Sequence, residues 1–304
     1  MNRRSTSGDQ RMCGGRSGDC DTGSLREDCS MHFFIIIAIT ILATVAPMPQ
    51  KRVAITIDDL PFLSGKIYLT PKQEAEGFRK VMATLKKHGV TAFGFVNGSR
   101  IKPYHRELFD EFVAAGHTIG NHTSTHPDLN STAVDWYEKD IADGQTEIAP
   151  WVGKTKYFRY PMLHEGPDEA KRSAIADYLS KNNLVSVPVT IDNDDYLYNR
   201  EYCQAMKSRN KSQADSIGAA YLVHMRERTA HFDSVVIAKA SRSVDHILLL
   251  HMTQLNADYL DSLLTWYANQ GWQFISPQDA LADSLYRMPQ KYLGPKGLSV
   301  LLRI

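Results

Sequence analysis

Two adjacent carboxylates, Asp58 and Asp59, follow a short apolar run at residues 52–57. Side chains alternate between the two faces of a strand, so neighbours at its end can take on different tasks. One carboxylate could hold a metal ion while the other handles a proton. An isolated pair of this kind, just before Pro61, is equally typical of a polar turn. The metal interpretation therefore needs support from other parts of the chain.

His122 and His126 form a second pair with a spacing suited to chemistry. Residues i and i+4 share one face of a helical turn, so we expect both imidazoles to point the same way. Two neutral imidazoles and a carboxylate form a three-ligand catalytic metal site with room for water. The alternative is that both histidines are polar loop residues. Their spacing and their place after a predicted strand favour the metal site.

The elements that must position these residues begin at Arg52, where short apolar runs start to alternate with amphipathic segments. That alternation is typical of βα units. Thr70, Pro71 and Gln73 form a capping-box pattern that marks the start of the first helix. The polar stretch at residues 192–245 gives no clear assignment. We predict seven strands, at residues 52–57, 91–96, 117–119, 156–158, 184–191, 246–250 and 272–275.

Seven βα units in a row favour a closed or nearly closed barrel in a single α/β domain, with a doubly wound open sheet as the alternative. Active sites of barrels form at the carboxyl ends of the strands. Further polar residues follow the later predicted strands: Arg159 after the fourth, Asp192 and Asp195 after the fifth, and His251 after the sixth. Each alone has an ordinary explanation, such as a surface ion pair. Together, these residues predict one site at the barrel mouth: Asp58, Asp59, His122, His126, Arg159, Asp192 and His251.

Five short segments make residues 52–283 resemble the polysaccharide deacetylases of the NodB-homology group, carbohydrate esterase family 4. With the family pattern in parentheses, they are TIDDLP at 56–61 (TFDDGP), HTSTHP at 122–127 (H-S/T-x-x-H), FRYPM at 158–162 (RxPY), DNDDY at 192–196 (DxxDW) and LLH at 249–251 (LxH). Five motifs in the family's order are far more specific than any one of them. The resemblance implies a distorted (β/α)7 barrel, TIM-barrel-like, which agrees with the strand count.

The resemblance also implies a metal site. Asp59, His122 and His126 would bind a divalent metal, most commonly Zn2+, with Co2+, Mn2+ or Ni2+ as alternatives. Such an ion polarises the acetamide carbonyl and lowers the pKa of its bound water. The backbone N–H of Met162 would stabilise the oxyanion of the tetrahedral intermediate.

Four further residues take acid–base roles in the implied reaction. Asp58 would be the general base, and Arg159 would orient it. His251 would protonate the departing amine as the general acid, while Asp192 would hold this histidine and raise its pKa. The reaction is the removal of acetyl groups from N-acetylated glycans, such as peptidoglycan, chitin-type chains or an exopolysaccharide.

Three positions depart from the family pattern: Leu60 replaces Gly, Met162 replaces Tyr, and Tyr196 replaces Trp. We expect Leu60, Tyr160 and Tyr196 to shape the walls of the substrate groove. The departures leave a small cyclic amide, hydrolysed at another non-peptide C–N bond, as an alternative substrate. A non-catalytic glycan-binding barrel would predict the loss of a metal ligand or of the acid, and neither is lost.

The first 30 residues are rich in Gly, Ser, Arg and Asp, and we predict a disordered extension. The apolar run at residues 33–46 is shorter than the roughly 20 residues that a comfortable membrane span needs. It suits a signal peptide over residues 31–46, with Met31 as the true start. If Met1 is the start, an uncleaved membrane anchor is the better interpretation. Both place the catalytic domain, residues 51–290, in the periplasm or outside the cell.

The composition excludes some partners. A net charge of +1 over 304 residues, with Lys and Arg scattered, gives no nucleic-acid footprint. We expect an acetylated glycan as partner, membrane contact only through the N-terminal apolar segment, and a monomer. Only Cys203 lies outside the N-terminal extension, so the mature chain would form no internal disulfide.

Overall fold

The structure is a computed structural model that describes residues 50–64 and 69–304. The predicted disordered extension, the signal or anchor segment and the cysteines of the extension all lie outside the described residues. Within the described part of the chain, no helix combines the length and the apolar character that crossing a membrane requires. All elements given below belong to one compact unit.

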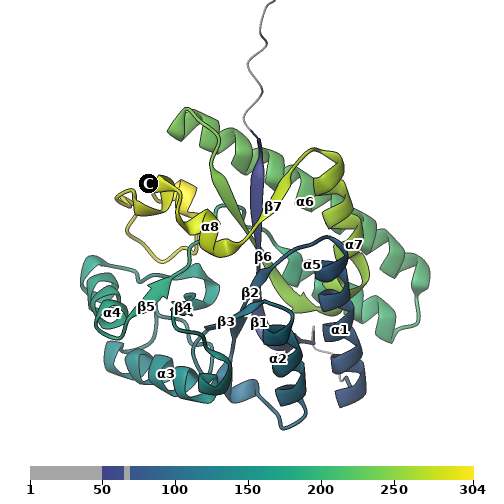
Figure 1. The fold of residues 1–304 in the computed structure, drawn as a ribbon, viewed down its shortest axis with the longest axis horizontal. Helices are drawn as coiled ribbons and strands as arrows, with labels where there is room; N and C mark the ends of the chain where they lie inside the picture. Colours follow the sequence, from purple (N-terminus) through teal and green to yellow (C-terminus); the bar gives the residue numbers. More distant parts are fainter. Residues whose placement is uncertain (1–49, 65–68) are drawn as a thin grey trace, which may run out of the picture. The chain divides into compact units, whose positions relative to one another are not determined.

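Seven strands form one sheet in the described part of the chain (Figure 1). They are β1 (Arg52–Leu63), β2 (Ala92–Val96), β3 (Thr118–Asn121), β4 (Lys156–Phe158), β5 (Leu184–Ser186), β6 (Asp245–Thr253) and β7 (Gln273–Ile275). Their order is β5-β4-β3-β2-β1-β6, and β7 pairs with β1. All pairings are parallel. The central element is β1, because it pairs with β2, β6 and β7.

The segment after β5 brings the two edges of the sheet together. Val187 donates its backbone N–H to the carbonyl of Phe158 in β4 at 2.8 Å, and Thr190 donates to Ile247 in β6 at 3.1 Å. Strands β1 to β5 thus follow one another in sequence order, and β6 returns beside β1. This order belongs to a curled barrel-type sheet and excludes the doubly wound alternative. The predicted (β/α)7-type fold is confirmed.

Eight α-helices of the described part follow the strands and surround the sheet (Figure 1). They are α1 (Pro71–Lys87), α2 (His105–Ala114), α3 (Val134–Glu147), α4 (Glu169–Lys181), α5 (Asp195–Lys207), α6 (Lys211–Ala240), α7 (Gln254–Asn269) and α8 (Pro277–Leu281). The predicted capping box starts α1: Thr70 Oγ1 accepts the N–H of Gln73 at 3.3 Å, and Gln73 Oε1 accepts the N–H of Thr70 at 2.9 Å. The sequence therefore marked this helix start correctly.

The stretch without a clear assignment, residues 192–245, contains α5 and the 30-residue α6. The buried residues of α6 recur every three or four positions, which is the period of one helix face. Gly218 and Thr229 belong to this buried stripe. Because neither residue is strongly hydrophobic, the pattern of hydrophobic residues in the sequence does not reveal the buried face of α6. The Thr229 hydroxyl lies 2.5 Å from that of Tyr267 in α7, which explains how a polar residue is accommodated there.

Alternation along β1 decides which of its side chains reach the site. Val53, Ile55 and Ile57 pack in the core that also holds the buried faces of the helices, whereas Ala54 packs with interior aromatic residues. Thr56 continues the interior set and is fully buried. The next residue with the same orientation is Asp58, which therefore faces the barrel interior.

Candidate active site

A pocket of about 650 Å³ lies where the carboxyl ends of the strands meet. It gathers eight of the residues that the sequence singled out: Asp58, Asp59, His122, His126, Met162, Asp192, Tyr196 and His251. Arg159 lies buried behind the wall, in contact with Asp58. These nine residues therefore lie together at the barrel mouth.

The register of two neighbouring strands sets Asp58 opposite His251. They are paired positions of β1 and β6. The pairing of β1 with β2, in contrast, is irregular between Ile57 and Leu60, and Asp59 within this irregularity has a φ of +61°. Bulges of this kind re-aim a side chain next to an active site. The two adjacent carboxylates consequently occupy different places in the pocket.

Asp59, His122 and His126 form a cluster whose ligand atoms all lie within 4.8 Å of one another. The Nδ1–H of His122 donates to the backbone carbonyl of Arg159 at 2.8 Å, which leaves Nε2 free as a ligand atom. Burial lowers the pKa of both histidines to about 4, so both imidazoles are neutral near pH 7. One carboxylate and two neutral imidazoles fit a zinc-type catalytic ion.

The two histidines come together by a route that differs from the predicted one. Residues 122–126 form a non-helical turn, and Thr123 and His126 have φ values of +66° and +60°. Asp140 of α3 holds this turn by accepting the N–H and the hydroxyl of Thr125, both at 3.0 Å. The centroids of the two imidazole rings lie 4.9 Å apart. Such backbone conformations are costly for residues other than glycine and persist where the surroundings enforce them.

The carboxylate of Asp59 has two further contacts. The side-chain amide of Asn97 donates to Oδ1, and Arg100 Nη1 lies 3.4 Å from the same oxygen. Burial acts to raise the pKa of Asp59, but nearby cationic groups, among them His251 and Arg100, outweigh it and lower the pKa. Asp59 is thus held as a carboxylate, the form that can bind a metal.

The pKa of Asp58, in contrast to that of Asp59, is raised. Arg159 Nη1 donates to Asp58 Oδ1 at 3.0 Å and to Thr56 Oγ1 at 2.7 Å, and Arg159 Nε donates to the carbonyl of Val187 at 3.0 Å. The arginine also lies over the ring of Phe95, 4.5 Å from its centroid. Burial raises the pKa of Asp58 to about 6 although the Arg159 charge opposes the rise. A carboxylate with a pKa close to the working pH suits a general base.

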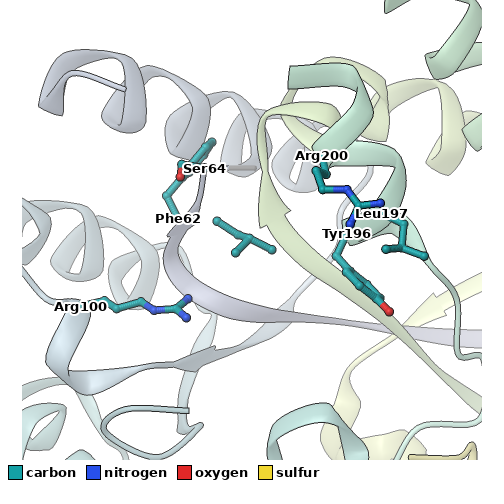
Figure 2. A pocket seen from close by; sticks show the side chains of 7 residues that line it. Phe62, Ser64, Arg100, Tyr196, Leu197 and Arg200 are labelled. Atoms are coloured by element: carbon teal, nitrogen blue, oxygen red, sulfur yellow. The ribbon is translucent and has the colours of Figure 1, made fainter. Parts of the chain in front are cut away.

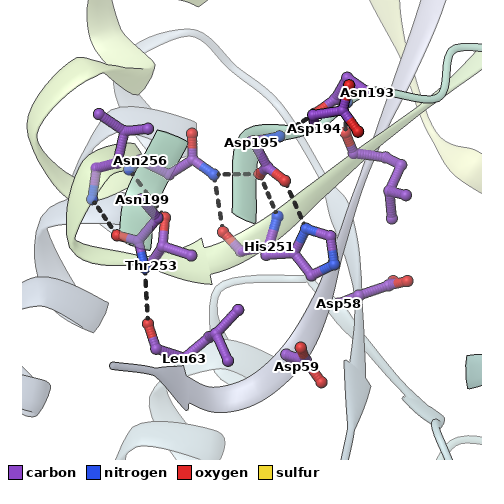
Figure 3. A network of polar contacts seen from close by, with 12 residues as sticks. Asp58, Asp59, Leu63, Asn193, Asp194, Asp195, Asn199, His251, Thr253 and Asn256 are labelled. Atoms are coloured by element: carbon purple, nitrogen blue, oxygen red, sulfur yellow. Dashed lines mark hydrogen bonds and ion pairs between the residues drawn. The ribbon is translucent and has the colours of Figure 1, made fainter. Parts of the chain in front are cut away.

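His251 is held by Asp195, and the prediction that Asp192 holds it is wrong. The carboxylate of Asp195 accepts from His251 twice, from Nδ1 at 2.6 Å and from the backbone N–H at 2.8 Å (Figure 3). Asn256 donates to the same carboxylate at 2.8 Å. Burial acts to lower the pKa of His251, but the charge and hydrogen bond of Asp195 raise it to about 9.

The turn before α5 explains why Asp195, and not Asp192, contacts His251. Asn193 Oδ1 accepts the N–H of Asp195 at 3.0 Å, while Asn193 Nδ2 donates to the carbonyl of Leu249 at 2.5 Å. This turn brings the fully buried Asp195, first residue of α5, against His251. Asp192 lies at the pocket wall instead, and burial raises its pKa to about 6.

Two of the three predicted groove residues do not line the pocket. Leu60 is fully buried in the core, where a Cβ on Gly94 would lie 2.6 Å from its Cδ2. Tyr160 is buried against Phe158, with ring centroids 5.0 Å apart. Only Tyr196 is a wall residue, 44% exposed and with its ring 5.6 Å from that of His251. The departure at Leu60 therefore alters packing and leaves the groove wall unchanged.

Sequence reasoning missed several wall residues, among them Arg100 and Gly297. Arg100 follows β2, so its place after a strand was the available signal. Gly297 lies beyond residue 290, where the predicted catalytic domain ends. Its backbone packs so closely on the Met162 loop that a Cβ would lie 1.9 Å from the Met162 carbonyl oxygen. Nothing in the sequence near Gly297 indicates this contact.

The chain is similar to known polysaccharide deacetylases. Residues 46–179 match the family model described as polysaccharide deacetylase. The chain is 25% identical to peptidoglycan-N-acetylmuramic acid deacetylase PdaA of Bacillus subtilis over 216 residues, which cover 69% of this chain and 68% of that protein. It is 36% identical to a chitooligosaccharide deacetylase of Rhizobium leguminosarum bv. trifolii over 101 residues, 30% of this chain and 46% of that protein.

The fold is similar to that of solved structures from carbohydrate esterase family 4. One is a pseudoenzyme from Bacillus anthracis, with a TM-score of 0.50 and 18% identity over 77% of this chain and 66% of that one. A mutant of this pseudoenzyme with restored activity has the same TM-score and 20% identity over 77% and 68%. The fold and the site together define a curled parallel-barrel protein with a metal-type carboxylate and histidine cluster. Over residues 46–179 the chain is similar to the polysaccharide deacetylases.

Proposed function

We propose that this enzyme is a metal-dependent deacetylase of N-acetylated glycans. The observation that carries the proposal is the presence, in one pocket, of a three-ligand cluster, a carboxylate of raised pKa at Asp58 and an imidazole of raised pKa at His251. Amide hydrolysis needs these parts together: an electrophilic centre, a base for the water and an acid for the leaving amine.

Each residue then has one task. A divalent metal held by Asp59, His122 and His126 would polarise the acetamide carbonyl and lower the pKa of the attacking water. Zn2+ fits the donor set, and Co2+, Mn2+ or Ni2+ are alternatives. Asp58 takes the proton of the water, and Arg159 holds its carboxylate in place.

The second half of the reaction falls to His251. The imidazolium, held by Asp195, protonates the departing amine of the sugar, which leaves as a free amino group beside acetate. We assign the backbone N–H of the pocket residue Met162 to the oxyanion of the tetrahedral intermediate.

The surroundings of the pocket favour an extended glycan over a small cyclic amide. Met162 and Tyr196 are 47% and 44% exposed at the wall, and a second pocket adjoins the first. Exposed walls that continue into a neighbouring hollow suit a chain of sugars. A non-catalytic barrel is disfavoured because all the acid, base and ligand groups are present.

We infer that the protein acts outside the cytoplasm, as the apolar segment at residues 33–46 predicts. Relatives are named for peptidoglycan, which supports a cell-wall or extracellular glycan as the partner. Membrane contact would arise only through that apolar segment, no nucleic acid is involved, and the monomer remains the expected state.

The proposal is tested by measuring acetate release from a panel of peptidoglycan, chitin oligomers and acetylated exopolysaccharides. Each assay is run on metal-free protein and after addition of Zn2+, Co2+, Mn2+ or Ni2+. We expect acetate release from at least one glycan, and only with added metal. Full activity in exhaustively chelated protein would contradict the metal mechanism.

A further inference from the structure

A second pocket, of about 460 Å³, adjoins the candidate active site (Figure 2). Leu63, Arg100 and Tyr196 line both pockets, so the two hollows share part of their walls. We call the second one the arginine pocket, after Arg100 on one side and Arg200 of α5 on the other. Figure 2 shows Arg100 and Arg200 on opposite sides of the pocket, with Arg200 next to Leu197 and Tyr196.

The proposed deacetylation reaction assigns no role to either arginine. The side chain of Arg200 is exposed and has no hydrogen-bond or ion-pair partner among the described residues. The side chain of Arg100 is 40% exposed, and its one ion pair is the 3.4 Å contact with Asp59. Arg200, a cation without an acidic partner among the described residues, adds a positive charge to a pocket that Arg100 also lines, and such an arrangement suits the binding of an anion.

The other walls indicate which anion. Phe62, Leu63 and Leu197 are apolar and lie beside the two guanidinium groups. A carboxylate on a short carbon substituent offers both an apolar part for these walls and a planar anion for bidentate binding by arginine. Arg200, the guanidinium without a partner in the described chain, supplies one positive charge for one carboxylate.

We propose that the arginine pocket is a subsite for a carboxylate carried by the glycan, on the acetylated sugar or on its neighbour in the chain. The inference rests on the proposed function, since it takes the adjoining pocket to be the deacetylation site. Two kinds of glycan carry such a group: one with lactyl ether substituents, as in muramyl sugars, and one with uronic acids. Arg200 then determines substrate specificity without taking part in the reaction.

The test compares matched substrates. Acetate release is measured from an N-acetylated muramyl oligosaccharide and from the same oligosaccharide after reduction of its carboxylates to alcohols. A second matched pair uses an acetylated uronic-acid glycan. For Arg200→Gln we expect KM to rise about tenfold on a carboxylated substrate, the usual size of a lost charge-assisted hydrogen bond, with kcat unchanged. KM on the reduced substrate should not change.

Lys207→Gln is the control. This substitution removes the same charge from the same helix, but Lys207 lines a different pocket. It should leave KM unchanged on all substrates. The pair on which Arg200→Gln raises KM identifies the carboxylate source. An equal effect of Arg200→Gln on carboxylated and reduced forms, or no effect on either pair, would overturn the proposal.

Direct binding separates this proposal from the proposed function. The dissociation constants of the full chain for the carboxylated and reduced oligosaccharides are measured by calorimetry, without turnover. Tighter binding of a carboxylated form that disappears in Arg200→Gln supports the subsite even if no glycan releases acetate. Equal binding of both forms overturns the subsite even if deacetylation is confirmed.

Discussion

Asp195 Oδ1 lies 2.6 Å from Nδ1 of His251, so the two side chains form a direct hydrogen bond. The carboxylate is fully buried and raises the pKa of this histidine to about 9 despite the opposing effect of burial. A buried imidazole without that carboxylate would lose its proton at much lower pH. The relationship makes Asp195 the residue that keeps the proposed acid protonated.

The dependence of kcat/KM on pH should reveal the effect of Asp195 on the pKa of His251. In Asp195→Asn the negative charge is lost, the pKa of His251 falls, and the protonated acid disappears at lower pH. The alkaline limb of kcat/KM should therefore shift to lower pH, with roughly a 10²-fold loss of kcat at pH 8. Asp192→Asn is the control and should shift that limb far less. A larger shift in the Asp192 variant would restore the role that the sequence indicated.

Metal content should depend on His126. His126→Ala removes one of the three clustered ligands, so both bound metal and acetate release should be lost. His164→Ala is a matched control, because His164 lines the same pocket, is hydrogen-bonded to Asp128 at 2.7 Å and lies outside the cluster. Elemental analysis of the two purified variants decides the matter. Equal metal content in both would contradict the ligand assignment.

Arg159 should be needed for both stability and rate. It is buried and bonds Asp58, Thr56 and the carbonyl of Val187. Arg159→Leu leaves Asp58 as an unpaired buried carboxylate, which costs about 3–5 kcal/mol of unfolding free energy. Arg159→Lys keeps the charge but cannot form all three bonds, so kcat should fall at least about tenfold in folded protein. Urea unfolding and acetate release measure the two effects, and a Lys variant with unchanged kcat would argue against positioning.

Substitution of Leu60 tests whether this departure from the family pattern affects substrate choice or the packing of the core. Because its side chain is fully buried, Leu60→Ala should reduce the free energy of unfolding by about 2–5 kcal/mol. The ranking of glycan substrates should stay as in the parent protein. Tyr196→Ala is the contrasting variant, since this exposed wall residue should change the ranking with little loss of stability. A stable Leu60 variant with a new substrate ranking would show that the groove assignment was right.

The sequence predicted the barrel and most of the site because both depend on local patterns. Asp58, Asp59, His122, His126 and His251 each come after an apolar strand as predicted from the sequence, and parallel strands bring such positions to one edge. The strand pattern predicts this convergence even where single boundaries differ by a few residues. The metal-type cluster therefore follows from motif and strand order alone.

The misses have a different origin, because they depend on the direction of side chains or on distant segments. Asp192 and Asp195 lie in one motif, and only the turn at Asn193 determines which of them reaches His251. Leu60 points into the core because of the irregular pairing of β1 with β2. Gly297 reaches the pocket through tertiary contacts of the C-terminal segment, for which no local pattern exists.

The central claim is that Asp58 is the base and that the neighbouring Asp59 is a metal ligand. The most direct measurement is acetate release by Asp58→Asn, with bound metal quantified in the same sample. We predict that acetate release falls by about 10²–10⁴-fold while the metal content equals that of the parent protein. Acetate release at the parent rate, or loss of the metal together with the activity, would contradict the division of roles between the two carboxylates.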